Sequence, residues 1–323
     1  MVQKKCIFWM LALCLLYAGC QTNNARLKPV IAGAWQSITQ QPDLGPFTGE
    51  KQQPVDFAVW KARDGSWQLW SCIRFAEIGG YSRLFYRWEG QSLSDSSWKP
   101  MGIAMMADTT LHEAEGGLQA PYVFEEDGTY YMFYGDWNNI CLATSKDGKT
   151  FQRVINQEGT AALFSGPLYN ARDPMVIKID SVYYCYYTAH NQNDSGSGEP
   201  QSAIFCRTSV NLKDWADPIV VSRGGSVMKQ SNWYGGDAES PFVVRLNNQY
   251  VLFRNQLYGQ NSLNTQYSSD NPLRFGDNTD ELMVGQLPVA APEIIKEGDQ
   301  YYIVSLKEEL NGMKIAPLQF VRE

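Results

Sequence analysis

Short apolar runs recur along this chain, each followed by a Gly, Asp or Asn turn and then by a second run rich in aromatic residues. This order is typical of two antiparallel strands joined by a turn. Five copies can be aligned, and the chain therefore consists of a repeated β unit. The first runs start at Val55, Gln119, Arg172, Glu239 and Ala290.

The copies agree in position as well as in composition. Four of the five first runs carry a proline at the same place, and every second run starts on an aromatic residue. In the second copy a third run covers residues 139–145, and Asp147-Gly148 turns toward a fourth, which predicts a four-stranded meander. The second runs start at Trp67, Tyr130, Tyr183, Tyr250 and Tyr301.

The spacing of the copies predicts how they assemble. The shared prolines stand at positions 121, 174, 241 and 292, a period of about 50 to 70 residues. This period is longer than a solenoid coil and suits a four-stranded blade with loop insertions. We predict an all-β fold, a five-bladed β-propeller over residues 46–323. A β-sandwich with chance placement of the prolines is the alternative.

Composition and charge narrow the possible partners. The 323 residues include 27 Lys+Arg against 34 Asp+Glu, a net charge of -7, and 44% are hydrophobic, which excludes a disordered chain. No run of cations is present to displace counterions from phosphates, so we expect no nucleic-acid partner. With two histidines, His112 and His190, and no CxxC pair, a structural zinc site of the usual spacing is not expected. We expect a monomer.

The N-terminus has the pattern of a bacterial lipoprotein signal. Lys4 and Lys5 precede an apolar stretch that is too short for a comfortable membrane span, and small residues lead to Cys20. We expect residues 1–19 to be removed and Cys20 to be lipidated. A plain secretory signal or an N-terminal anchor is the alternative.

This signal makes three further predictions. Cleavage removes two lysines, which leaves 25 basic against 34 acidic side chains and a mature net charge of -9. Residues 20–45 serve as a tether and a strand that closes the ring. The protein is then an exported bacterial lipoprotein at the outer membrane or facing the periplasm, which contacts the membrane only through its lipid.

The remaining cysteines lie within strand-like runs: Cys72, Cys141, Cys185 and Cys206. Buried free thiols are the simplest interpretation. An oxidising compartment would permit a disulfide between Cys185 and Cys206 if their strands are neighbours.

Charged residues break the repeat in three copies. One position of the repeat lies directly before the shared proline, and in the first copy it lies before Phe57. Asp56 and Asp173 occupy this position in the first and third copies, whereas the other copies have Ala or Ser there. One position earlier, only the fourth copy has a carboxylate, Glu239. Because the innermost strands of a propeller start at one mouth of the channel, these three acids should meet there.

Such a cluster indicates chemistry, because neighbouring carboxylates repel one another and their pKa values are driven apart. A structural role and a calcium site in the central channel are the alternatives. We expect no other cofactor.

Asp on the first blade, Asp on the third and Glu on the fourth, each before an innermost strand, resemble glycoside hydrolase family 43 and its five-bladed relatives in families 32, 62, 68 and 117. The resemblance covers roughly residues 50 to 323. Arg172-Asp173-Pro174 is also similar to the Arg-Asp-Pro motif of family 32. The Trp-Met-Asn-Asp-Pro-Asn opening of that family is absent around Asp56, and Ser-Pro follows Glu239 where family 32 has Cys, which favours a divergent family 43-like enzyme.

The resemblance implies a role for each acid. Asp56 is the general base, Glu239 the general acid, and Asp173 the group that orients the acid and raises its pKa. Cleavage of an acetal needs one acid to protonate the leaving oxygen and one carboxylate to activate water on the opposite face. Asp237 is the nearest competitor for the acid role.

Residues that line the rim are predicted from the ends of the second strands, which return to the same mouth. Trp137 suits the apolar face of a sugar, and His190 suits a substrate or a channel metal. The cationic side chains Arg74, His190 and Arg254 either pair with the acids or bind an anionic group of a sugar. Arg74 is the best candidate for binding such a group. The predicted substrate-binding residues are Arg74, Asp136, Trp137, His190 and Arg254.

These features together predict a glycosidase that cleaves a terminal bond of a plant or algal polysaccharide or oligosaccharide by inversion. The alternatives are a carbohydrate-binding propeller without catalysis and a retaining fructan-type hydrolase. The sugar, its anomer and exo or endo action depend on loop shapes that this pattern does not specify.

Overall fold

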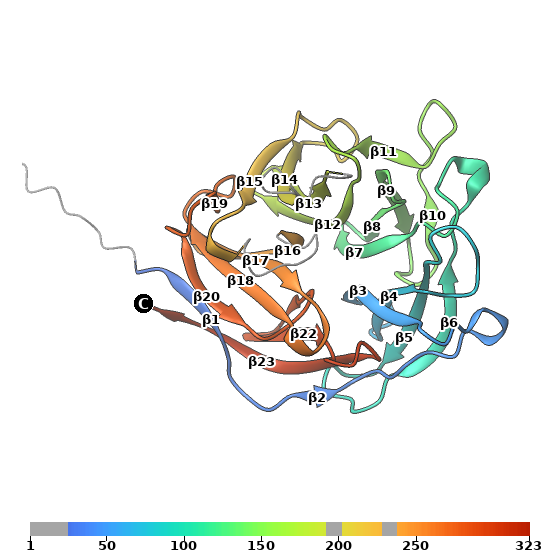
Figure 1. Ribbon diagram of the computed structural model, residues 1–323, viewed down its shortest axis with the longest axis horizontal. Helices are drawn as coiled ribbons and strands as arrows, with labels where there is room; N and C mark the ends of the chain where they lie inside the picture. Colours follow the sequence, from blue (N-terminus) through green and yellow to red (C-terminus); the bar gives the residue numbers. More distant parts are fainter. Residues whose placement is uncertain (1–24, 192–201, 228–237) are drawn as a thin grey trace, which may run out of the picture.

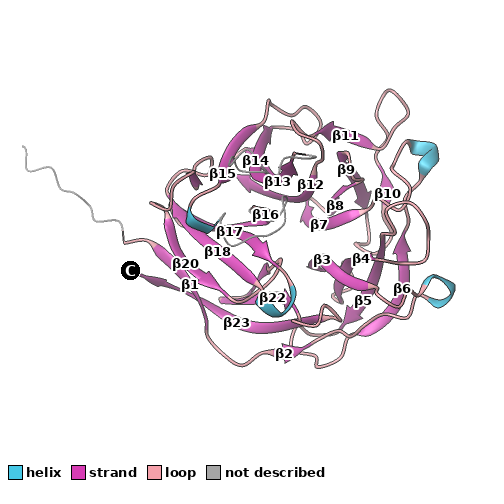
Figure 2. Cartoon of the chain, in the orientation of Figure 1, coloured by secondary structure: helices cyan, strands magenta, loops and turns pink. Residues whose placement is uncertain are grey.

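Five β-sheets stand around a central axis in the computed structural model, which describes residues 25–191, 202–227 and 238–323 (Figure 1). This arrangement confirms the predicted five-bladed β-propeller. The proposed signal, Cys20 and Asp237 lie outside the described residues. Strands make up most of the fold, and short 3-10 helices occupy loops (Figure 2). Among the described residues, no helix has the length and apolar character needed to cross a membrane.

Each blade is built on an antiparallel meander whose first strand lines the channel. Blades one and two consist of β3 (Gln53–Lys61), β4 (Trp67–Arg74), β5 (Leu84–Gly90) and β6 (Lys99–Met105), then β7 (Gln119–Glu126), β8 (Thr129–Gly135), β9 (Asn139–Ser145), β10 (Gln152–Arg153) and β11 (Ala162–Ser165). Blades three and four consist of β12 (Arg172–Ile179), β13 (Val182–His190), β14 (Ser202–Ser209), β15 (Ile219–Arg223) and β19 (Gly276–Asp277), then β16 (Glu239–Leu246), β17 (Gln249–Leu257), β18 (Leu263–Ser269) and β20 (Met283–Leu287). In blade three, β19 adds to the meander parallel to β15.

Blade five closes the ring with strands from both ends of the chain. It consists of β21 (Glu293–Glu297), β22 (Gln300–Leu306), β23 (Met313–Arg322), β1 (Leu27–Ile31) and β2 (Gln36–Ser37). β1 pairs antiparallel with β23, from Leu27 opposite Arg322 to Ile31 opposite Leu318. This pairing ties the N-terminal segment to the last blade, and the two segments lie side by side in Figure 1.

A β-bulge near the start of the inner strands explains the repeated sequence position. The residue before the shared proline, or before Phe57, has a positive φ in all five blades. Small and Asp side chains tolerate this left-handed conformation better than bulky or β-branched ones, so Ala, Ser and Asp occupy the position. The φ angles are 33° at Asp56, 39° at Ala120, 54° at Asp173, 41° at Ser240 and 43° at Ala291.

Apolar and aromatic side chains fill the space between blades. Phe85 of blade one and Tyr134 of blade two, for example, form an edge-to-face pair with ring centroids 6.1 Å apart. Burial of such a side chain contributes roughly 1.5–3 kcal/mol. This packing holds the inner strands in fixed positions around the channel.

The four described cysteines are buried free thiols. Cys185 and Cys206 do lie on neighbouring strands, but Cys206 is opposite Tyr186 and Cys185 is opposite Arg207. Successive side chains of a strand point to opposite faces, so the two thiols face different sides of the sheet. The disulfide that the sequence left open is therefore excluded in this fold.

Candidate active site

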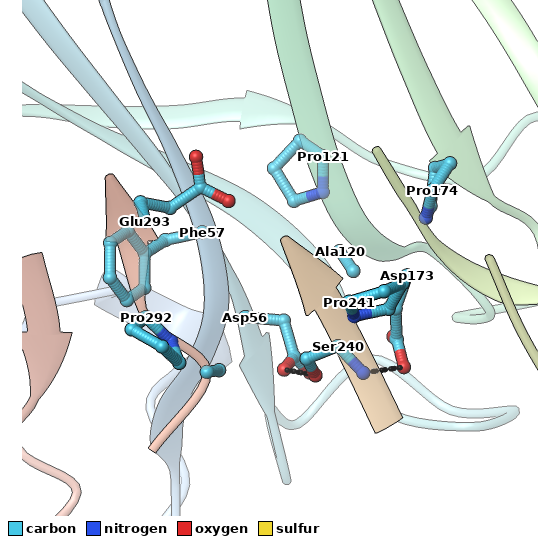
Figure 3. A pocket seen from close by; sticks show the side chains of 11 residues that line it. Asp56, Phe57, Ala120, Pro121, Asp173, Pro174, Ser240, Pro241, Pro292 and Glu293 are labelled. Atoms are coloured by element: carbon cyan, nitrogen blue, oxygen red, sulfur yellow. Dashed lines mark hydrogen bonds between the residues drawn. The ribbon is translucent and has the colours of Figure 1, made fainter. Parts of the chain in front are cut away.

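The three predicted acids come together at one mouth of the channel. Asp56 is the fourth residue of β3, Asp173 the second of β12 and Glu239 the first of β16. Asp56 and Asp173 line the channel pocket together with Ser240, and Figure 3 shows both carboxylates turned toward Ser240. Glu239 lies directly behind this wall and is 3% exposed.

Asp56 is the more accessible acid, and two hydroxyl groups hold it. Ser240 Oγ donates to Asp56 Oδ1 at 3.0 Å, and the Tyr258 hydroxyl donates to the same oxygen at 2.8 Å. The two hydroxyl groups also contact each other at 2.8 Å. Within the described residues Oδ2 of Asp56 has no hydrogen bond, so this oxygen is available to accept a proton from water.

Arg172 is the centre of the buried part of the site. Its guanidinium pairs with Glu239 Oε1, lies 3.4 Å from Asp173 Oδ2 and donates to Asn170 Oδ1 at 2.6 Å. The side chain is almost fully buried. A buried cation needs such partners, because the loss of hydration is otherwise too costly.

The environments of the two buried acids shift both pKa values upward. Burial, together with the charges of Asp173 and Asp56, raises the pKa of Glu239 to about 8, although Arg172 acts in the opposite direction. Burial and the charge of Asp56 raise the pKa of Asp173 to about 6, again against Arg172. Among the described residues, Glu239 Oε2 and Asp173 Oδ1 are buried without a hydrogen-bond partner. Glu239 is therefore protonated at neutral pH and suited to donate a proton.

His190 lies behind Arg172 and does not line the channel pocket. Its Nδ1 forms a hydrogen bond with the Arg172 guanidinium. Burial and the Arg172 charge lower the pKa of His190 to about 3, so the ring is neutral and Nδ1 accepts the bond. In this structure the residue orients Arg172, whereas the sequence suggested contact with a substrate or a metal.

The predicted rim residues have different surroundings. Arg74 donates to Gln53 Oε1 through two nitrogens, at 2.9 and 2.6 Å, and forms no ion pair with the three acids, all of which the structure describes. Asp136 is buried and accepts the backbone N–H groups of Asn138 and Asn139, at 2.9 and 2.6 Å, so it stabilises a turn. Neither observation gives these residues a sugar contact.

Trp137 and Arg254 are also engaged with protein groups. The Trp137 ring stacks on Tyr81 with centroids 3.8 Å apart. Arg254 is fully buried and donates to Ser222 Oγ at 3.0 Å and to the Gly224 carbonyl at 2.8 Å. Its guanidinium contacts the end of β15, and the substrate contact of Arg254 stays a prediction.

Two groups of the site were missing from the predicted residues. The sequence presents Arg172 as part of an Arg-Asp-Pro motif. An Arg next to an Asp that lies at a β-bulge is the signal that indicates the ion pair. Tyr258 lies after β17 in a loop that the repeat does not predict. For the residues that the structure describes, no cluster of three or more His, Cys, Asp and Glu side chains has metal-site geometry. The calcium alternative therefore gains no support from these side chains.

Solved structures of known proteins share this architecture. A thermostable family-43 glycoside hydrolase superimposes with a TM-score of 0.61 at 18% identity, covering 85% of this chain and 91% of that one. An endo-arabinase from Bacteroides thetaiotaomicron VPI-5482 superimposes with a TM-score of 0.63 at 15% identity, covering 86% and 98%. The chain has the five-bladed fold of family 43 glycoside hydrolases. At these identities the likeness concerns the fold.

One curated protein is similar in sequence. A 1,2-beta-oligomannan phosphorylase from Thermoanaerobacter sp. (strain X514) is 31% identical over 120 residues, which is 37% of this chain and 36% of that protein. The chain thus matches little more than a third of the length of this relative. No family model matches the sequence.

We expect Tyr258→Phe to lower kcat about 10- to 100-fold with little change in KM, because one of the two donors to Asp56 is lost. Steady-state kinetics on a substrate found by screening glycosides and oligosaccharides measures this split. Tyr186→Phe is the matched control, since that hydroxyl donates to the Pro272 carbonyl at 2.7 Å, away from the acids. Equal losses of kcat in both variants would contradict a positioning role for Tyr258.

Proposed function

We propose that this protein is a glycoside hydrolase that cleaves a terminal glycosidic bond of a plant or algal oligosaccharide or polysaccharide. One observation carries the proposal: two carboxyl groups at the same mouth have opposite environments. Asp56 lines the pocket and has one oxygen without a hydrogen bond to the residues that the structure describes, and Glu239 is buried with a pKa of about 8. A buried carboxyl group that keeps its proton and an accessible carboxylate beside it are the two groups that acetal hydrolysis requires.

In this proposal the two acids have different tasks in the reaction. Glu239 donates its proton to the glycosidic oxygen as the bond to the anomeric carbon breaks. Asp56 accepts a proton from the water that attacks the same carbon from the other side. Glu239 then carries a negative charge next to Arg172, and this ion pair stabilises the carboxylate until a proton returns.

Asp173 and His190 act through their neighbours. Asp173 lies beside Arg172 and accepts the Ser240 N–H at 3.2 Å, so its charge raises the pKa of Glu239 while its carboxylate fixes the strand. His190 holds the guanidinium from the opposite side. The resemblance to family 43 supports inversion of the anomeric centre.

A substrate screen tests this proposal. Purified protein without the first nineteen residues is incubated with nitrophenyl glycosides and with arabinan, xylan, mannan and fructan oligosaccharides, with and without inorganic phosphate. We expect release of a free sugar that does not depend on phosphate, and proton NMR of the first product should show inverted configuration. Sugar phosphate as the product, or no cleavage of any substrate, would contradict a hydrolase. A retained anomer would contradict inversion alone.

We also propose that the protein is exported and held to a bacterial membrane through a lipid on Cys20. The charged, apolar and small residues before Cys20 support this proposal. Radiolabelled palmitate should be incorporated by the full chain and not by Cys20→Ala. Labelling of that variant would contradict the assignment.

A further inference from the structure

Exposed aromatic side chains gather at the mouth that carries the acids. Among the described residues, three aromatic side chains are more than a third exposed: Phe75 at 48%, Tyr81 at 41% and Tyr169 at 39%. Phe75 and Tyr81 lie between β4 and β5, and Tyr169 precedes β12. Both segments are at the end of the blades where the inner strands start. Such a concentration of exposed apolar surface marks a binding surface.

Two of these residues form one continuous surface with Trp137. Tyr81 stacks on Trp137, with ring planes 13° apart. Burial and the charge of the nearby Tyr169 phenol raise the pKa of Tyr81, so the two phenol groups lie close together. We call Tyr81, Trp137 and Tyr169 the aromatic rim. Its members come from blades one, two and three.

The rim is connected to the buried acid. The Tyr169 N–H donates to the His190 carbonyl at 3.1 Å, and the two rings meet edge to face with centroids 6.1 Å apart. His190 contacts Arg172, which pairs with Glu239. The rim is therefore packed against the residues that hold the buried acid.

We propose that the aromatic rim binds sugar units beyond the one cleaved, so that the substrate is a chain of several sugars and not a small glycoside. The apolar C–H faces of sugar rings pack on aromatic rings, and the phenol groups supply hydrogen bonds to hydroxyls. In this arrangement Tyr81 and Tyr169 present the binding surface, and Trp137 supports Tyr81 from behind. The inference rests on the proposed function for the location of the cleaved unit.

Two measurements on the mature chain test the rim. The first is affinity electrophoresis in gels that contain soluble arabinan, xylan or mannan. The second is the ratio of kcat/KM for a sugar chain to kcat/KM for the nitrophenyl glycoside of the same sugar. The variants are Tyr81→Ala, Tyr169→Ala and the double variant. The control is Tyr301→Ala, which removes a half-buried tyrosine that packs edge to face on Phe320, 5.2 Å away, at the start of β22 and thus at the opposite mouth.

We expect each single variant to weaken binding of one of these polysaccharides about 3- to 10-fold and to lower the kcat/KM ratio by a similar factor. The control should change neither. The inference is overturned if no polysaccharide retards the wild-type protein or if the double variant is retarded as much as the wild type. It is also overturned if the variants lower kcat/KM for the sugar chain and for the nitrophenyl glycoside by the same factor.

The two proposals can fail separately. Retardation that depends on Tyr81 and Tyr169, without cleavage of any substrate, would contradict the hydrolase and leave the rim in place. Cleavage with retardation that is independent of both tyrosines would contradict the rim alone.

Discussion

Glu239→Gln lowers kcat on a sugar chain by about 10²- to 10⁴-fold and leaves binding of that chain intact, because the amide keeps the shape of the side chain but has no proton of suitable pKa to donate. The loss should be much smaller on a dinitrophenyl glycoside, whose leaving group departs without protonation. Kinetics on both substrates, with calorimetry for binding, measures this difference.

Glu126→Gln is a suitable control for this variant. Glu126 is also paired with a cation, Lys178, but lies at the far end of β7. The control should keep wild-type kcat. Wild-type turnover of the sugar chain by Glu239→Gln would contradict the assignment of Glu239 as the acid.

The raised pKa of Glu239 gives the same assignment a pH signature. Wild-type kcat/KM for the chain should fall as pH rises through about 8, where the acid loses its proton. The stability of the fold should change with pH in the same direction. The pKa of Glu239 in the folded protein lies above its unfolded value of about 4.3, so the contribution of this group to the free energy of unfolding is complete below about pH 4.3. That contribution is lost as the pH rises through about 8. Between pH 5 and 9 the melting temperature of Glu239→Gln should therefore decline less than that of the wild type.

Asp56→Asn is expected to lose activity by a similar factor, about 10²- to 10⁴-fold, for a different reason: no carboxylate then takes the proton of the attacking water. Since the missing step is activation of water, the loss should be equal for the sugar chain and the dinitrophenyl glycoside. This pattern distinguishes the base from the acid.

Azide and a matched variant complete this test. If azide replaces the activated water, the glycosyl azide should have the inverted configuration, as observed by NMR. Asp180→Asn is the control, because Asp180 also has a positive φ, 57°, but stands in an exposed turn. An azide product with retained configuration would contradict the inverting role of Asp56.

The repeat and the acids could be predicted from the sequence because they depend on position within a unit. Each copy places the same position at the same height in the channel, so residues that differ between copies meet there. Asp56, Asp173 and Ser240 do occupy equivalent bulge positions, with Glu239 one residue earlier. The third strand of the second copy, residues 139–145, also coincides with β9.

The repeated strand pattern does not predict the geometry of the loops between strands. Tyr258 follows β17 in a loop outside the repeated strands, and its hydroxyl group reaches Asp56 across the channel. Tyr81 approaches Trp137 because a loop of blade one folds against blade two. These contacts join residues of different blades, and the repeat does not specify how a loop crosses between them.

The sequence by itself determined the β-propeller, its five units and the convergence of three carboxyl groups. Only the tertiary structure decided which cation pairs with these carboxyl groups. Arg172 is buried between Glu239 and Asp173. Arg254 instead donates to Ser222, and Arg74 donates to Gln53. Strand position fixes the height of a side chain in the blade. Which partner a long, flexible cation reaches depends on the packing of neighbouring blades and on which hydrogen-bond acceptors that packing brings close to its guanidinium.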